Sequence, residues 1–166
     1  MKTGWFIAVA GSFYLFVVAL FWPVEKQMAA SGRLAVDANG YGRATVVFSD
    51  ASVHALVPTT TALQELGLAG RTQLTDVEGM LWIFDPPQRP SFWMKGMIIP
   101  LDFVWLNSGR IVDLTSDVSP PIDPSSTNMP IIDPIVPVDG VLEVAAGFVS
   151  RYGLRVGDEA RVDMTE

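Results

Sequence analysis

The hydrophobic pattern begins with an uncharged segment that runs from Gly4 to Val24. A helix of this length measures about 31 Å, close to the ~30 Å hydrocarbon core of a bilayer. Aromatic side chains are distributed along the segment and would anchor it in the membrane. Those at its two ends would lie at the membrane interfaces. They are Trp5, Phe6, Phe13, Phe16, Phe21 and Trp22. We therefore expect a transmembrane helix over 4–24, preceded by a short N-terminus over 1–3.

A cleaved signal peptide is the alternative interpretation of this segment. The apolar region of a signal peptide spans about 7–15 residues and ends in a small-x-small cleavage site. The segment here is longer, and Met28 stands where the nearest candidate site needs a small side chain. An uncleaved anchor is favoured.

After a polar, glycine-containing stretch over 25–42, which predicts a linker, the pattern changes to short runs of β-branched and aromatic residues. These runs predict strands over 44–48, 53–57, 80–84, 103–106, 110–114, 141–145 and 159–163, with short helices over 60–66 and 146–152. Turn residues over 49–51 and 107–109 predict hairpins. The expected fold class is α+β: one transmembrane helix, then a compact, mostly antiparallel, barrel-like β domain over 43–166 with two short helices.

The stretch from 116 to 140 contains six of the twelve prolines, four aspartates and no basic residue. So many prolines disfavour regular structure. Its apolar residues, which include Ile131 and Ile132, favour an ordered surface loop.

Charge refines the topology and narrows the class of partner. Lys2 precedes the apolar segment, whereas all 18 acidic residues follow it, and the net charge is −7. Although Lys26 and Arg33 weaken the contrast, the pattern favours a cytoplasmic N-terminus and an extracytoplasmic domain on the inner membrane of the cell. An acidic domain argues against nucleic acid, which needs clustered Lys and Arg. Cys is absent, so disulfides and thiolate chemistry are excluded.

The middle of the chain carries the run Phe92-Trp93-Met94-Lys95-Gly96-Met97, followed by Ile99-Pro100-Leu101-Asp102. This run resembles the signature of the DUF192 family of domains of unknown function, in which F-W-M-K-N-T precedes I-P-L-D. The blocks Gly79–Phe84, Val141–Gly147 and Gly153–Asp158 are similar to further blocks of that family, and the resemblance extends over about 53–162. It implies a mostly β domain and no reaction. Gly96 and Met97 replace the family's Asn and Thr, which indicates that part of any polar ligand site has been lost.

The charged residues of the matching blocks are the candidate ligand contacts. Lys95, Asp102 and Glu143 could surround a small polar pocket that takes an anionic or carbonyl ligand. The structural alternative pairs Lys95 with a carboxylate and gives Asp102 and Asp158 to turns. The structural alternative is favoured.

Neither a metal site nor a nucleophile is indicated. His54 is the sole histidine, whereas zinc sites use two or more His or Cys ligands, and it fits a packed or edge-strand position better. The carboxylates of Asp117, Asp123, Asp133 and Asp139 could in principle bind Ca²⁺, but their spacing fits no EF-hand loop. No cofactor or catalytic residue is expected.

Two further groups of apolar residues could bind a partner. The aromatic concentration of Trp82, Phe84, Phe92, Trp93, Phe103 and Trp105 could form a stacking platform, although alternation along strands favours a core. The proline-rich stretch carries an apolar set that a protein partner could cover: Met129, Ile131, Ile132, Ile135 and Val136.

We therefore expect a non-catalytic, membrane-anchored accessory subunit whose extracytoplasmic domain packs on a larger membrane protein complex, for example a respiratory or photosynthetic one. Its partners would be the lipid bilayer and other membrane subunits. The alternative is a ligand-binding module of the cell envelope with a pocket near Lys95 and Glu143, and a hydrolase-type enzyme is the weakest reading.

Overall fold

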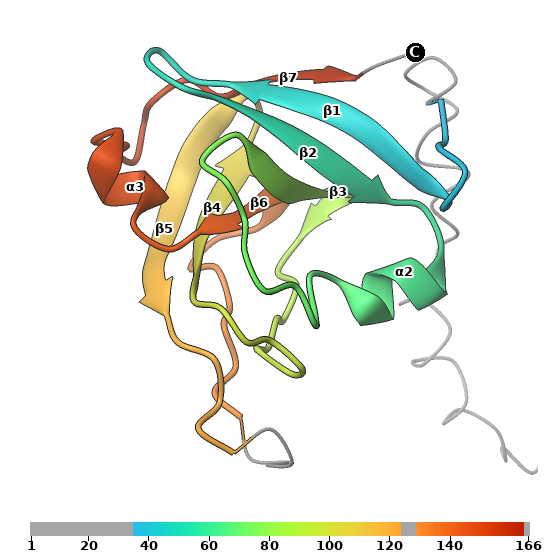
Figure 1. The fold of residues 1–166 in the computed structure, drawn as a ribbon. Coiled ribbons are helices and arrows are strands. Elements are labelled where there is room, and N and C mark those ends of the chain that lie inside the picture. The colour runs from blue at the N-terminus through green and yellow to red at the C-terminus, as the bar shows by residue number, and fades with distance from the viewer. Residues whose placement is uncertain (1–34, 124–128, 165–166) are drawn as a thin grey trace, which may run out of the picture.

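The computed structural model describes residues 35–123 and 129–164, and the strands within them form one seven-stranded sheet (Figure 1). Its elements in chain order are β1 Tyr41–Val47, β2 Ser52–Pro58, α2 Thr61–Leu66, β3 Glu78–Gln88, β4 Leu101–Asn107, β5 Arg110–Val118, β6 Val138–Ala145, α3 Phe148–Arg151 and β7 Arg161–Met164. The strands lie in the order β5-β4-β6-β3-β2-β1-β7. All neighbouring strands are antiparallel except β2 and β3, which are parallel.

Two hairpins form where turn residues interrupt the β-rich runs. The β1–β2 turn closes through the Phe48 N–H, which donates to the Ala51 carbonyl. At the β4–β5 turn both Ser108 and Gly109 have positive φ, at 52° and 73°. This pair of positive φ angles is what a tight two-residue hairpin needs, and Gly109 adopts its angle without steric penalty.

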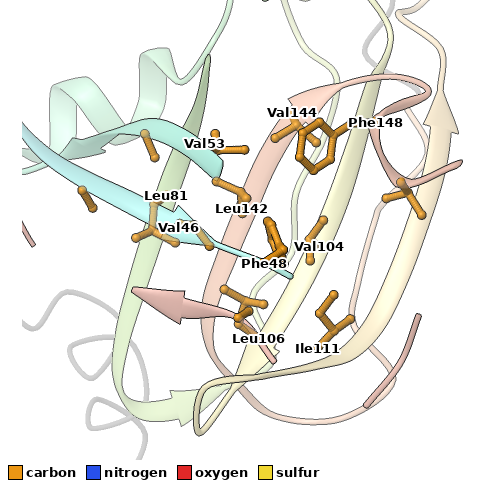
Figure 2. Close-up of a cluster of buried hydrophobic side chains, with 14 of the residues drawn as sticks. Val46, Phe48, Val53, Leu81, Val104, Leu106, Ile111, Leu142, Val144 and Phe148 are labelled. Carbon is orange, nitrogen blue, oxygen red and sulfur yellow. The ribbon is translucent and has the colours of Figure 1, made fainter. Parts of the chain in front are cut away.

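The sheet curls around a hydrophobic core, so the described chain is a half-barrel. Side chains from β1 and β2 pack against side chains from β4 and β5, although these pairs lie toward opposite ends of the strand order. Figure 2 shows this core, in which Val46 and Phe48 from the first hairpin face Val104, Leu106 and Ile111. The ring of Phe148, in α3, lies 6.1 Å from that of Phe48 and covers one end.

A second cluster occupies the other face of the sheet. Leu81, Val104 and Leu142 belong to the first core, whereas their chain neighbours Met80, Phe103 and Val141 belong to the second. Successive residues of a strand point to opposite faces, which explains this division. Two loops, over 89–100 and 129–137, add Phe92, Met94, Met97 and Ile132 to the second cluster.

The predicted fold class is wrong as it was stated. In place of the barrel-like domain the sheet forms a curled half-barrel, with β5 and β7 at the two ends of the strand order and one isolated bridge, Arg110 to Glu159, between β5 and the segment before β7. In the described residues no helix is long and apolar enough to cross a membrane, and α2 and α3 have six and four residues. The predicted span over 4–24, with the aromatic anchors Trp5, Phe6, Phe13, Phe16, Phe21 and Trp22, lies outside the described residues.

Candidate functional site

The central strand β6 carries an acidic side chain into the second apolar cluster. In the sheet register Glu143 stands opposite Met80 of β3 on one side and opposite Phe103 of β4 on the other. Directly opposed residues share a face, so Glu143 points to the face of these two apolar side chains. It retains only 6% of its surface exposure.

Burial changes the acidity of this carboxyl group. Desolvation of the charged form raises the pKa of Glu143 from 4.5 to about 7, and the side chain of Trp82 lowers it by a smaller amount. The indole Nε1 of Trp82 is itself buried, and no acceptor in the described residues meets hydrogen-bond geometry with it. Glu143 and Trp82 are therefore interacting polar groups that no well-formed hydrogen bond holds together.

Aromatic rings cover this pair from the loop over 89–100. Phe92 packs edge-on against Trp82 at 5.1 Å between centroids, and its ring lies 5.8 Å from those of both Phe103 and Trp105. Trp105 also donates from Nε1 to the Thr115 hydroxyl at 3.0 Å. The loop that begins at Arg89 thus seals the face on which Glu143 lies.

Asp102 points away from Glu143. It stands opposite Val144 in the register and shares the face of the first core. Its carboxylate accepts hydrogen bonds from the backbone N–H groups of Asp117 and Val149, at 2.8 and 2.9 Å. Asp102 is fully buried and accepts hydrogen bonds from the end of β5 and the beginning of α3. The structure therefore does not bring it together with Glu143.

Lys95 is exposed at the tip of the loop over 89–100. Its Nζ lies 6.0 Å from the centre of the Trp93 ring. The adjacent Gly96 has φ of +72° and its carbonyl accepts the Gly70 N–H, which fixes the turn. A Cβ at Gly96 would lie 3.1 Å from that of Ala69, so the glycine replaces the Asn of the family signature at a crowded turn.

The two loops expose a set of apolar side chains. Phe92 and Ile132 exchange two backbone hydrogen bonds of 3.0 Å, and both side chains pack in the second cluster. Trp93 and Ile131 are the chain neighbours of the two residues in this antiparallel bridge, and both side chains are exposed. Their exposed fractions are 58% and 56%.

We name Trp93, Ile131, Ile135 and Val136 the two-loop surface. Of the five residues that the sequence indicated for partner binding, Ile131, Ile135 and Val136 are exposed, Met129 is half-buried and Ile132 is buried. Trp93 was assigned to the core with its neighbour Phe92. Alternation was the missed signal, because adjacent residues in an extended segment cannot both face inward.

The remaining candidates stay dispersed. His54 is exposed on β2 and its Nδ1 lies 3.3 Å from the Thr45 hydroxyl. Over residues 35–123 and 129–164, no three His, Asp or Glu side chains are grouped closely enough to hold a metal ion. Asp139 accepts the Ser108 N–H and Asp158 accepts the Arg155 N–H, so these carboxylates organise turns.

Solved structures share this fold. A protein of unknown function from Novosphingobium aromaticivorans is 27% identical, with a TM-score of 0.62, covering 81% of this chain and 96% of its own. A candidate transcription regulator from Sinorhizobium meliloti is also 27% identical, with a TM-score of 0.63, covering 79% of this chain and 98% of its own. No curated protein matches the sequence.

The family comparison agrees with the signature around Lys95. The model of the DUF192 family, described as an uncharacterised ACR, matches residues 44–162, which include every strand from β2 to β6 and the loop over 89–100. The chain belongs to the DUF192 family.

Proposed function

We propose that this domain is a non-catalytic accessory module that binds another protein through the two-loop surface. The observation that carries the proposal is the exposure of Trp93 and Ile131, two large apolar side chains that are more than half exposed and flank the bridge between Phe92 and Ile132. Contiguous exposed apolar side chains are typical of sites that a partner covers. Tryptophan in particular contributes much of the binding energy at such sites.

Hydrogen bonds hold the two loops together in the closed arrangement, which favours binding. Besides the backbone bonds between Phe92 and Ile132, Arg89 donates from Nε to the Pro134 carbonyl at 2.9 Å. The Ile135 N–H donates to the Asp113 carboxylate at 3.0 Å. A surface held in this way loses little conformational entropy when a partner binds.

Charge around the surface indicates what the partner should present. Lys95 and Arg89 lie on the loop that carries Trp93, in a chain whose net charge is −7. The ammonium group of Lys95 lies over the Trp93 ring and is exposed. A matching partner offers an apolar depression for Trp93 with a carboxylate at its rim, because opposite charges at a rim assist association.

Site-specific photo-crosslinking tests this proposal in the full-length protein expressed in its native cells. A photoreactive phenylalanine is placed at position 93 or at position 131, and the control carries it at the exposed Val156, on the segment before β7. We expect positions 93 and 131 to crosslink the same protein and position 156 to leave it unlabelled.

A quantitative step follows with that purified partner. Trp93→Ala combined with Ile131→Ser should weaken binding by at least about tenfold, as loss of a central aromatic anchor does. Equal binding by the double variant and by Val156→Ser would refute the proposal. Crosslinking of positions 93 and 131 to lipid in place of protein would refute it as well.

A further inference from the structure

Glu143 and the two-loop surface are joined by a short series of packed side chains. Glu143 stands opposite Met80 and so shares a face of the sheet with Trp82, which lies two residues further along β3. The indole of Trp82 packs edge-on against Phe92, and the backbone of Phe92 bridges to Ile132. The chain neighbours Trp93 and Ile131 belong to the two-loop surface. A change at the carboxyl group therefore reaches the surface through one aromatic contact and one backbone bridge.

We propose that the protonation state of Glu143 controls the two-loop surface. While the carboxyl group is protonated, the loop over 89–100 stays closed on the sheet, and loss of the proton releases the loop. The closing step stands on the packing around Glu143, whereas its effect on a partner rests on the function proposed above. In the closed arrangement the carboxyl group lies between Met80 and Phe103, beneath the loop that contributes Phe92 and Met94 to the same cluster.

Among the described residues, no cation on a neighbouring element forms an ion pair with the carboxylate of Glu143. The titratable groups of β3 are Asp85, which is exposed, and Glu78, whose carboxylate accepts the N–H and hydroxyl of Thr75. On β4 Asp102 points to the opposite face, and on β6 Asp139 accepts the Ser108 N–H. On the covering loop Lys95 is exposed over Trp93, and the exposed Arg89 donates to the Pro134 carbonyl. Arg71, in the segment before β3, acts on Glu78.

The direction of the effect follows from solvation. A carboxylate held among apolar side chains loses its water, so the charged form gains when the loop opens and water enters. In the part of the chain that the structure describes, the group that supports the charge in the closed arrangement is the Trp82 N–H. Opening should therefore increase with pH over the range in which the open arrangement is already ionised while the closed arrangement still holds its proton. It should level off once Glu143 is ionised in both arrangements.

Amide hydrogen exchange of the full-length protein measures this opening without any partner, so its result is independent of the proposed docking function. The probes are the Phe92 N–H, which donates to the Ile132 carbonyl, and the Met97 N–H, which donates to the Met94 carbonyl. After correction for the intrinsic exchange rate, we expect their opening constants to rise at least about tenfold between about pH 5.5 and about pH 7.5. At each pH they should exceed those of amides in β4 and β6.

Two variants and a control decide the matter. Glu143→Gln keeps the shape and removes the charge, so its loop opening should not depend on pH. Trp82→Phe removes the N–H that supports the carboxylate, so the opening should level off at a higher pH than in the wild type. Glu65→Gln, on the exposed face of α2, should behave as the wild type.

The following outcomes would contradict the proposal. Loop opening in the wild type that does not change with pH would sink the proposal, as would a pH dependence that survives in Glu143→Gln. Opening constants of the loop equal to those of β4 and β6 would show that only global unfolding occurs. If Glu143→Gln does not fold, the shift expected for Trp82→Phe still decides, and its absence rejects the proposal.

Discussion

The carboxylate of Asp102 accepts the backbone N–H of Val149, which lies 47 residues further along the chain. Val149 is the second residue of α3, so the N–H is one that the helix itself leaves without a partner. The other carboxylate oxygen of Asp102 accepts the Asp117 N–H. One buried side chain thus connects the end of β5, the strand β4 and the beginning of α3.

Replacing Asp102 by Ala should lower the free energy of unfolding by about 2–4 kcal/mol, because one buried and one part-buried N–H group lose a charged acceptor. Urea denaturation measures the change. Asp50→Ala, in the exposed β1–β2 turn, is the control and should change stability by less than about 0.5 kcal/mol. Equal stability of the two variants would show that water replaces the Asp102 carboxylate at no cost.

Glu143 gives the stability a particular pH dependence. Its pKa is about 7 in the folded protein against 4.5 in an unfolded chain, so between these values the folded state binds more protons than the unfolded state. The free energy of unfolding should therefore fall as the pH rises from about 4.5 to about 7, by at most about 3 kcal/mol, and change little above that range. Glu143→Gln should remove this fall, as urea denaturation at a series of pH values can show.

A glycine on β3 marks the closest approach of two strands. A Cβ at Gly79 would lie 2.6 Å from the Glu143 carbonyl oxygen and 2.9 Å from Cγ1 of Val53, whereas a Cβ at Gly140 would come no closer than 3.4 Å to the Trp82 carbonyl oxygen. Gly79→Ala should therefore cost about 3 kcal/mol or more, and Gly140→Ala less than about 1.5 kcal/mol. Thermal unfolding of the two variants compares them directly.

The strands and hairpins were largely predictable because their information is local. The β-rich runs around Ala44, Val104 and Leu142 are flanked by turn residues, and strands form at each of them. The extent of β3 was not predictable, since the strand runs on through Pro86 and Pro87 to Gln88. A proline that cannot donate to a ladder ends a strand only where a neighbour needs its N–H, and the sequence does not say which strand is the neighbour.

The closure of the sheet and the faces of its side chains depend on distant pairing. The parallel contact of β2 with β3 places Leu56 beside Met80 and leaves β5 and β7 at the ends of an open sheet, which no local pattern encodes. In the same way, Asp102 and Glu143 both follow apolar runs, but the register of β4 with β6 sends them to opposite faces. Lys95 and Glu143 were candidates for one pocket, and the structure exposes Lys95 on a loop and buries Glu143 on β6. The N-terminus over 1–3 and the transmembrane helix over 4–24 stay predictions.

The adjacent residues Phe92 and Trp93 offer a test that separates folding from binding. Phe92 contacts the rings of Trp82, Phe103 and Trp105, so Phe92→Ala should lower the free energy of unfolding by about 2–4 kcal/mol. Trp93 is 58% exposed, so Trp93→Ala should change it by less than about 1 kcal/mol while weakening partner binding at least about tenfold. Urea denaturation gives the first quantity, and titration with the crosslinked partner gives the second. Normal binding by Trp93→Ala would show that Trp93 is not part of the interface. If Trp93→Ala were as unstable as Phe92→Ala, Trp93 would belong to the core, because a side chain that holds the loop in place cannot also be free to enter a partner.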